Sequence, residues 1–129
     1  MLIADDHEAI RKGVRTILRS REDVEICGEA SNGSEVVQMA FETKPDLIIL
    51  DLTMPVMGGF AAAKELRRLL PEIPILFYSI HDGAQLIKEA KHAGARGFVN
   101  KSRISDTLLD AVDAVVVRNG TFFPDSGGD

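Results

Sequence analysis

The stretch PDLIILDLTMP, residues 45–55, decides how this chain folds. Its apolar run, Leu47–Leu50, meets a carboxylate at Asp51, and Pro55 turns the chain soon afterwards. A short apolar run between turn signals is typical of a strand that is buried on both faces. An aspartate is costly to bury without a partner. We therefore expect the sheet to end at Asp51, with its carboxylate at the edge.

The same alternation of strand-like and helix-like patterns continues on both sides of this stretch. Strands are predicted at Met1–Ala4, Val24–Ala30, Leu47–Leu50, Ile73–Tyr78 and Gly97–Val99. Helical stripes lie between them, and Ser34 is expected to cap the second helix. The stripes are Ile10, Val14, Ile17 and Leu18; Val36, Val37, Ala40 and Phe41; Phe60, Ala63, Leu66, Leu69 and Leu70; Leu86, Ile87, Ala90 and Ala93; and Ile104, Leu108, Leu109, Val112, Val115 and Val116.

Five strand–helix pairs predict one α/β domain over residues 1–121, with 122–129 as a C-terminal linker or disordered tail. Strands that alternate with helices join through right-handed crossovers into a parallel sheet. Strands that are apolar throughout need helices on both faces. The expected architecture is a doubly wound, five-stranded parallel sheet with the flavodoxin-like strand order 2-1-3-4-5.

The composition argues against several classes of protein. The 129 residues include 20 acidic and 15 basic side chains, so the net charge of −5 gives no basic footprint for nucleic acid. Cys27 is the only cysteine, which excludes an internal disulfide and a cysteine metal cluster, and we expect it to fill the core. With no visible secretory signal and no apolar run of membrane-spanning length, the sequence indicates a cytoplasmic protein without membrane contact.

Polar residues follow four of the predicted strands at the points where those strands end. They are Asp5 and Asp6 after the first strand, Asp51 after the third, Ser79 after the fourth and Lys101 after the fifth. In doubly wound folds, ligands bind outside the carboxyl ends of the strands, where the strand order reverses. For the order 2-1-3-4-5 this place lies between the first and third strands.

The expected edge concentrates negative charge. Two carboxylates about 4 Å apart repel each other by roughly 4 kcal/mol at an effective dielectric constant near 20, so the aspartates need a cation. Carboxylate oxygens suit Mg²⁺, which keeps several waters and bridges to a phosphate. Lys101 adds a point charge and Ser79 a hydroxyl donor. This set favours phosphoryl transfer, in which an aspartate can be the nucleophile that carries the phosphoryl group.

Each of these residues also has an ordinary structural explanation. Asp5 or Asp6 could cap the first helix, and Ser79 could cap the fourth. Asp51 could be a plain strand-end residue, and Lys101 a solvated loop lysine. Their joint placement at matching strand ends favours one site over separate explanations, because independent accidents must multiply.

Four ordered motifs resemble the receiver domain of response regulators, the CheY-like fold of two-component signalling, from Leu2 to about Phe123. LIADDH resembles the acidic pair after the first strand, and PDLIILDLTMPVMGG the phosphoacceptor segment. PILFYSIHD resembles the strand with the switch hydroxyl, and GARGFVNKS the segment with the switch aromatic and the lysine. ADDH and GEASNG also resemble the NarL/FixJ branch, whose members usually carry a C-terminal helix-turn-helix DNA-binding domain.

The resemblance implies that Asp51 accepts a phosphoryl group from a sensor histidine kinase or phosphotransfer protein. It also implies that Asp6, Asp51 and the backbone carbonyl of Thr53 bind Mg²⁺ (or Mn²⁺), with Asp5 acting through water. Such a chain is not a conventional enzyme, because it catalyses only its own phosphorylation and dephosphorylation.

The resemblance further implies a switch. Ser79 would turn toward the phosphoryl group, Lys101 would pair with it, and Phe98 would rotate inward. Thr53 and His81 would flank the phosphate and tune its lifetime. The surface of the fourth helix, fifth strand and fifth helix would then change shape. A homodimer is expected through that surface or through the first and fifth helices.

Two positions depart from the family pattern: Gly58, where the family often has aspartate, and Ser102, where many members have proline. The chain stops about where a linker to a DNA-binding domain would begin, so it is either an excised receiver or a stand-alone one. DNA binding is expected from a missing C-terminal domain and not from this chain itself.

Three other functions remain as alternatives. The first is a stand-alone or phosphorylation-independent receiver that acts as a protein-docking module. The second is a phosphatase of the haloacid-dehalogenase type, which would need an acidic residue two positions after Asp51, where this chain has Thr53. The third is a flavin or dinucleotide binder, whose first loop would cradle phosphate, but DDHEA there is acidic.

Overall fold

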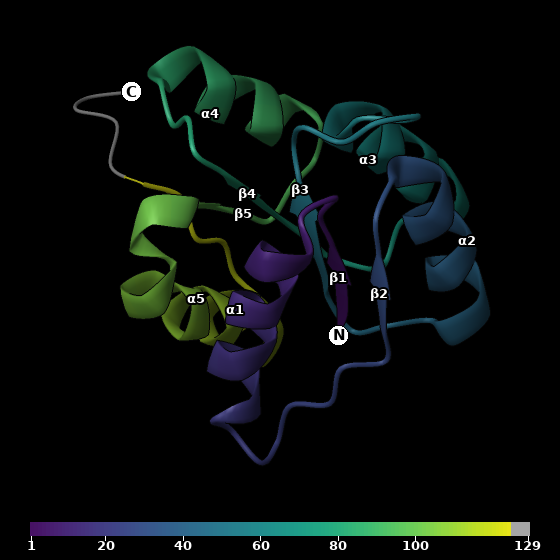
Figure 1. The fold of residues 1–129 in the computed structure, drawn as a ribbon. Coiled ribbons are helices and arrows are strands. Elements are labelled where there is room, and N and C mark those ends of the chain that lie inside the picture. The colour runs from purple at the N-terminus through teal and green to yellow at the C-terminus, as the bar shows by residue number, and fades with distance from the viewer. Residues whose placement is uncertain (125–129) are drawn as a thin grey trace.

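Strand β3 (Ile48–Asp51) lies at the centre of a five-stranded sheet in the computed structural model, which describes residues 1–124 (Figure 1). The other strands are β1 (Leu2–Ala4), β2 (Gly28–Ala30), β4 (Ile75–Ser79) and β5 (Gly97–Asn100). The helices are α1 (Glu8–Arg19), α2 (Gly33–Thr43), α3 (Gly59–Leu69), α4 (Ala84–His92) and α5 (Ile104–Val112). All neighbouring strands are parallel, in the order β2-β1-β3-β4-β5, which confirms the predicted fold.

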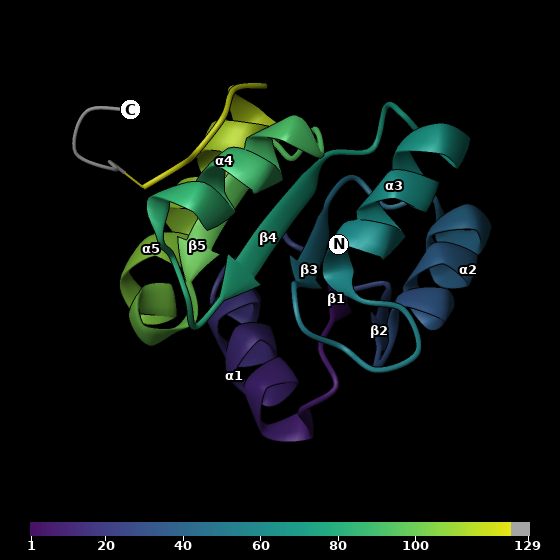
Figure 2. The ribbon, with the colours of Figure 1, turned by 90° about the horizontal axis from the view of Figure 1, so that it is seen from above.

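The sheet separates two apolar cores. Helices α1 and α5 cover one face, and α2, α3 and α4 cover the other (Figure 2). Along β3 the side chains alternate: Ile48 and Leu50 enter the core under α2–α4, and Ile49 enters the core under α1 and α5. Each such buried side chain stabilises the fold by roughly 1.5–3 kcal/mol. All of β3 is buried, so Asp51 ends a strand that is held on both faces.

Strand β2 is shorter than predicted. The prediction of Val24–Ala30 was wrong at its start, because β1 offers only Leu2–Ala4 as a partner and β2 pairs with it over Gly28–Ala30. Cys27 just precedes the paired segment and is exposed, so the expectation that it fills the core was also wrong.

Helix α2 differs from its prediction at the cap and at one position of its stripe. Asn32 caps it in place of Ser34, because the Asn32 side-chain oxygen accepts a hydrogen bond from the Glu35 N–H at 2.9 Å. Phe41 was predicted on the buried face, but it lies at the edge of the stripe and is 56% exposed. The Lys44 ammonium lies 4.2 Å from the centroid of the Phe41 ring, a cation–π contact at the surface.

The last helix changes geometry near its end. After Val112 it continues as a π-helical turn, Asp113–Val117, in which the Arg118 N–H bonds to the carbonyl of Asp113 at 2.9 Å. Asn119, with φ of 54°, then turns the chain out of the helix, at an Asn-Gly pair. Among the helices within residues 1–124, none is both long and apolar enough to pass through a bilayer.

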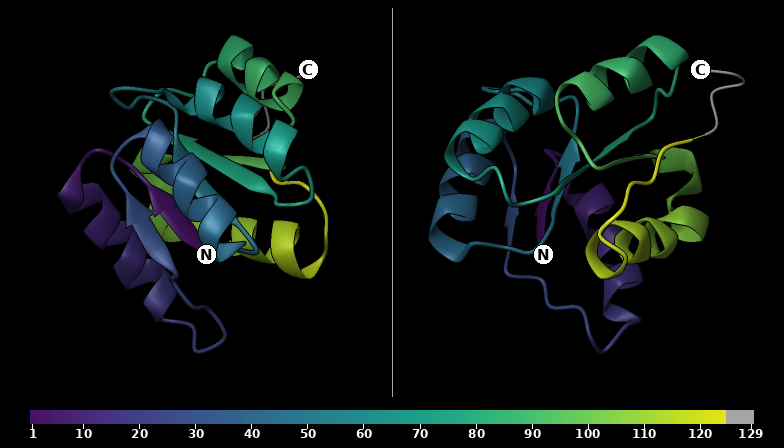
Figure 3. Two further views of the ribbon diagram at one scale, coloured as in Figure 1. Left: turned by 90° about the vertical axis from the view of Figure 1, so that its right-hand side faces the viewer. Right: turned by 180° about the vertical axis from the view of Figure 1, so that it is seen from behind.

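The chain returns from this turn to the free edge of β5 (Figure 3). Phe122 forms a parallel bridge with Gly97, and its carbonyl accepts a hydrogen bond from the Phe98 N–H at 2.8 Å. Of the linker or tail predicted over 122–129, residues 122–124 therefore lie on the domain. The predicted disorder falls on 125–129, which are outside the described residues.

Candidate functional site

The two central strands bring the predicted carboxylates side by side. Ala4 of β1 is in register with Leu50 of β3, so Asp5 and Asp51 follow at the same edge of the sheet. The Asp5 side chain is fully buried, and only 4% of the Asp51 side chain is exposed. Helix α1 begins after His7, so neither aspartate is its N-cap residue.

Lys101 joins these carboxylates from the end of β5. Its ammonium nitrogen lies 2.8 Å from Oδ2 of Asp5 and 3.1 Å from Oδ1 of Asp51, and only 10% of its side chain is exposed. Buried charges require paired partners. The explanation of Lys101 as a solvated loop lysine is therefore excluded by its contacts.

The surroundings shift the pKa values of this trio apart. Burial, followed by the charge of Asp5, raises the pKa of Asp51 above its ordinary value in spite of Lys101. Burial also acts to raise the pKa of Asp5, but hydrogen bonds from Lys101, the His7 N–H and Tyr78 outweigh it and hold that pKa below its ordinary value. Burial opposes the charge on Lys101, yet its bonds to both aspartates raise its pKa. Of these two buried carboxylates, Asp51 is therefore the one whose charge the fold stabilises less.

Asp6 and His7 complete a set of groups that could hold a metal. One ligand atom from each of Asp5, Asp6, His7 and Asp51 can be chosen so that all lie within 4.8 Å of one another. Three carboxylates against the single ammonium of Lys101 leave a negative site that suits a divalent cation. Mg²⁺ prefers such oxygens and usually takes only one or two carboxylates directly. The residues therefore fit the metal that the sequence predicts.

The loop after Asp51 is tightly built. The Thr53 N–H donates to Oδ1 of Asp51 at 3.3 Å. The Met57 N–H donates to the Pro55 carbonyl at 2.7 Å, and Val56 between them has φ of 68°, which makes a strained γ-turn. At the start of α3, a Cβ on Gly59 would collide with the carbonyl oxygen of Asp51. The loop therefore packs closely on the backbone of Asp51.

The predicted switch residues lie on the neighbouring strands. Ser79 ends β4, is 4% exposed, and accepts a hydrogen bond from the His81 N–H at 3.1 Å. The ring of Phe98 is fully buried in the core under α2–α4, so the structure has it in the inward position. The roles predicted for these residues and for Thr53 concern a phosphorylated state and stay predictions.

Sequence reasoning missed two residues of the site, His7 and Tyr78. The His7 Nδ1 atom lies 3.1 Å from an oxygen of Asp5 and 3.1 Å from an oxygen of Asp6. The Tyr78 hydroxyl donates to Oδ2 of Asp5 at 2.8 Å from within the core. Their positions next to predicted site residues, in DDH and YS, were the available signals.

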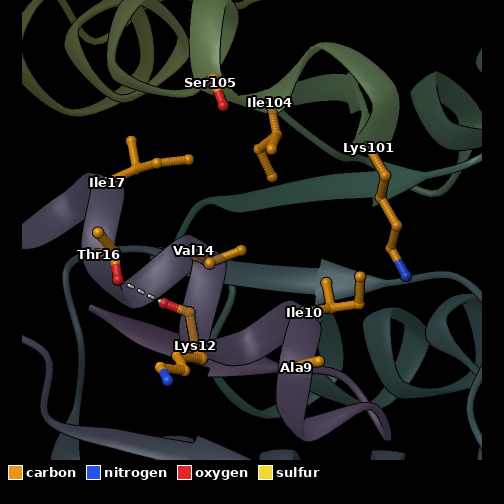
Figure 4. A pocket seen from close by; sticks show the side chains of 10 residues that line it. Ala9, Ile10, Lys12, Val14, Thr16, Ile17, Lys101, Ile104 and Ser105 are labelled. Atoms are coloured by element: carbon orange, nitrogen blue, oxygen red, sulfur yellow. Dashed lines mark hydrogen bonds between the residues drawn. The ribbon is translucent and has the colours of Figure 1, made fainter.

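A groove of about 480 Å³ lies apart from the carboxylates, between α1 and α5 (Figure 4). Ile10, Val14 and Ile17 of α1 and Ile104 of α5 give it an apolar lining. Lys101 stands at one end of the groove while its ammonium binds the two aspartates. The groove lacks the donor set of the acidic site, but it is connected to that site through one residue.

Comparison with known proteins gives a consistent result. The family described as response regulator receiver domain matches residues 1–113. The transcriptional regulatory protein YdfI of Bacillus subtilis is 34% identical over 125 residues, which cover 97% of this chain and 58% of that protein. The transcriptional regulatory protein DegU of Brevibacillus brevis is 31% identical over 122 residues, which cover 95% of this chain and 51% of that protein.

A solved structure agrees with these sequence matches. The crystal structure of a LuxR-family two-component response regulator from Aurantimonas superposes with a TM-score of 0.89 at 30% identity, over 94% of this chain and 86% of that one. The chain spans between about half and three-fifths of the length of the two curated relatives named above.

Proposed function

This chain belongs to the response regulator receiver domain family, and from that premise we propose that Asp51 accepts a phosphoryl group from a sensor histidine kinase or phosphotransfer protein. The observation that carries the proposal is the position of Asp51. It ends the central strand, is nearly buried, has a raised pKa and contacts Lys101. A carboxylate whose charge is poorly stabilised, beside a fixed cation, is suited to attack phosphorus.

The step is a transfer between two protein side chains. A carboxylate oxygen of Asp51 forms a bond to phosphorus while the bond from phosphorus to the donor's histidine nitrogen breaks, and that nitrogen keeps the electron pair. Lys101 is 3.1 Å from Oδ1 of Asp51 and can turn its ammonium to the phosphoryl oxygens. The Ser79 hydroxyl can donate to another. In phosphoryl transfer such positioning and charge neutralisation is most of the catalysis.

Asp6, Asp51 and the Thr53 carbonyl would hold Mg²⁺ or Mn²⁺, with Asp5 acting through water. When bound, the divalent ion would offset the negative charge of the carboxylates and of the transferred group. The Thr53 N–H contact to Asp51 supports this assignment, because it fixes the loop that carries the carbonyl. His7 lies close enough to Asp5 and Asp6 to compete for the same oxygens.

The output proposed for this site is a change of surface. The phosphoryl group carries nearly two negative charges and three strong acceptor oxygens, and it replaces the single charge of the Asp51 carboxylate. Ser79 then turns toward these oxygens. The burial of the Phe98 ring in the core under α2–α4 supports a role for this ring in the switch. Either the α4–β5–α5 surface or the α1–α5 surface then forms a homodimer. A DNA-binding domain beyond this chain, as in a transcription regulator, is the proposed effector.

The test uses a small phosphodonor. The chain is incubated with acetyl phosphate and Mg²⁺, and its intact mass is measured. We expect the mass to rise by one phosphoryl group, stable in acid and labile in base, and the rise to require the metal. Asp51→Asn should abolish it.

Two outcomes would overturn the proposal. A phosphoryl gain in Asp51→Asn at the same segment would remove Asp51 from its role. A wild-type chain that gains nothing and binds no Mg²⁺ would favour the phosphorylation-independent docking module instead.

A further inference from the structure

Tyr78 is a buried residue that the proposed transfer does not use. It is in register with Asp51 across the β3–β4 pair and fully buried against the core under α1 and α5. It is the only tyrosine of the chain, which has no tryptophan. A buried tyrosine hydroxyl needs a hydrogen-bond partner, so the partner of this one shows what it does.

The hydroxyl contacts the site directly. It donates to Oδ2 of Asp5 at 2.8 Å, and the Lys101 ammonium contacts the same oxygen at 2.8 Å. The ammonium also lies 4.8 Å from the centroid of the Tyr78 ring. The other oxygen of Asp5, Oδ1, accepts the His7 N–H at 2.9 Å. Tyr78 therefore fixes the rotation of a fully buried carboxylate from the side opposite His7.

The two groups that contact Oδ2 of Asp5, Lys101 and Tyr78, would respond differently to phosphorylation. Lys101 has to give up part of its contact with Asp5 when it turns to a phosphoryl group on Asp51. A buried carboxylate oxygen left without a donor is strongly disfavoured. Tyr78 belongs to the strand itself and its hydroxyl already donates to Asp5, so it can keep Asp5 paired throughout.

We infer that Tyr78 is a positioning residue of this site, whose hydroxyl holds Asp5 in the orientation that serves the metal and keeps it paired when Lys101 moves. The second half of this inference rests on the proposed function, and the first half concerns metal binding alone. Groups that orient metal-site ligands typically change metal affinity 10- to 100-fold when they are removed.

The main test is the affinity for Mg²⁺ alone, measured by calorimetry. Tyr78→Phe removes only the hydroxyl and keeps the buried ring. We expect its dissociation constant for Mg²⁺ to rise about 10-fold or more. Leu76→Val is the matched control, because it trims the same face of β4 one pair of residues away from the site. It should lower stability without changing the Mg²⁺ affinity. Equal affinities in wild type and Tyr78→Phe would overturn the inference.

The fluorescence of the single tyrosine gives a second readout that a purely structural residue would not move. Adding Mg²⁺ to the wild type should change the emission of Tyr78, with the same midpoint as in calorimetry. Asp5→Asn should change the emission of the metal-free protein, because it alters the acceptor of the hydroxyl. Emission that is indifferent to both would overturn the inference.

These results are separable from the fate of the proposed function. A wild type that shows the Tyr78 effect on Mg²⁺ but takes no phosphoryl group from acetyl phosphate overturns the transfer and leaves Tyr78 as a positioning residue for the metal. In the opposite case the wild type is phosphorylated, Tyr78→Phe binds Mg²⁺ as tightly as the wild type, and the tyrosine emission of the wild type does not respond to Mg²⁺. That result overturns the inference about Tyr78 and leaves the proposed transfer in place.

Discussion

Asp5 and Asp51 are the same residue type at the same sheet edge, and the fold treats them in opposite ways. Asp5 receives donors from Lys101, His7 and Tyr78, whereas the Lys101 ammonium and one backbone N–H serve Asp51. The folded-state pKa of Asp5 lies below its value of 3.8 in the unfolded chain, and that of Asp51 lies above it. The fold stabilises the ionised form of Asp5 and disfavours the ionised form of Asp51.

The linkage between pKa and stability gives opposite signs for the two aspartates. Without metal at pH 7, Asp5→Asn should lower the free energy of unfolding by about 1–3 kcal/mol, because charge-assisted hydrogen bonds are weakened. Asp51→Asn should raise it, because a buried charge next to Asp5 is removed. Urea unfolding with a chelator present, followed across pH, measures both.

The pH dependence provides the check on this pair. The stability from Asp5 is present above pH 3.8 and is lost as pH falls through its lower folded-state pKa, so the Asp5→Asn deficit should shrink in acid. The destabilisation from ionised Asp51 exists above its raised pKa and disappears as pH falls toward 3.8, so the Asp51→Asn gain should shrink too. Two substitutions that shift stability in the same direction at pH 7 would contradict the contrast.

Most of the site could be predicted from the sequence because parallel strands end together. Asp5, Asp51 and Lys101 each follow an apolar run, and their meeting requires only the strand order. The role of Tyr78 could not be predicted, because it depends on register. A shift of one residue along β4 would turn its hydroxyl to the other face of the sheet. His7 was missed because an exposed histidine at a helix start has many ordinary explanations.

At the scale of elements, apolar patterning predicted each strand and helix, and pairing decided where they end. Strand β2 is limited to Gly28–Ala30 because it pairs only with Leu2–Ala4 of β1. The sequence around β2 carries no information about the length of that partner. The exposed ring of Phe41 has a similar origin. An apolar stripe predicts which side of a helix is buried, but it does not predict how far around the helix the core extends. The π-helical turn at Asp113–Val117 has no sequence signal that we recognise.

One side chain, together with backbone hydrogen bonds, contacts the segment after this turn. The guanidinium of Arg96 donates to the carbonyls of Asn119 at 2.8 Å and Gly120 at 3.2 Å. These contacts hold the chain where Phe122 can pair with the edge of β5. An edge strand exposes unpaired backbone groups, and here the chain's own continuation covers them beside Phe98.

Arg96→Ala should release this segment. We expect the amide hydrogen of Phe98 to exchange with solvent at least several-fold faster, because its acceptor is the Phe122 carbonyl. Hydrogen exchange followed by NMR measures it. Arg118→Ala is the matched control, because it removes an exposed guanidinium with the same charge from the same region. Unchanged exchange at Phe98 in Arg96→Ala would show that the pairing does not need the clamp.

At the scale of the whole molecule, the two candidate dimer surfaces are not equivalent. The α4–β5–α5 surface is partly covered by Phe122 and Phe123, and the Lys91 ammonium lies 5.1 Å from the centroid of the Phe123 ring. The α1–α5 groove is apolar, and Ile10 on it is 37% exposed. Lys101 lines the groove and contacts both aspartates, so the movement proposed for it on phosphorylation would reach this surface directly. We therefore favour α1–α5 as the dimer surface.

Gly13 tests that choice, because it lines the groove and a Cβ there would meet nothing within 4 Å. Gly13→Lys should leave the monomer folded but prevent dimers, since the groove already carries Lys12 and the added charges of two copies would repel. Gly13→Ala is the control: it should stabilise α1 by roughly 0.5–1 kcal/mol and dimerise like the wild type. Light scattering with acetyl phosphate and Mg²⁺ gives the masses. If phosphorylated Gly13→Lys dimerises as well as the control, the contact lies on α4–β5–α5 instead, and the segment at Phe122 has to move to allow it.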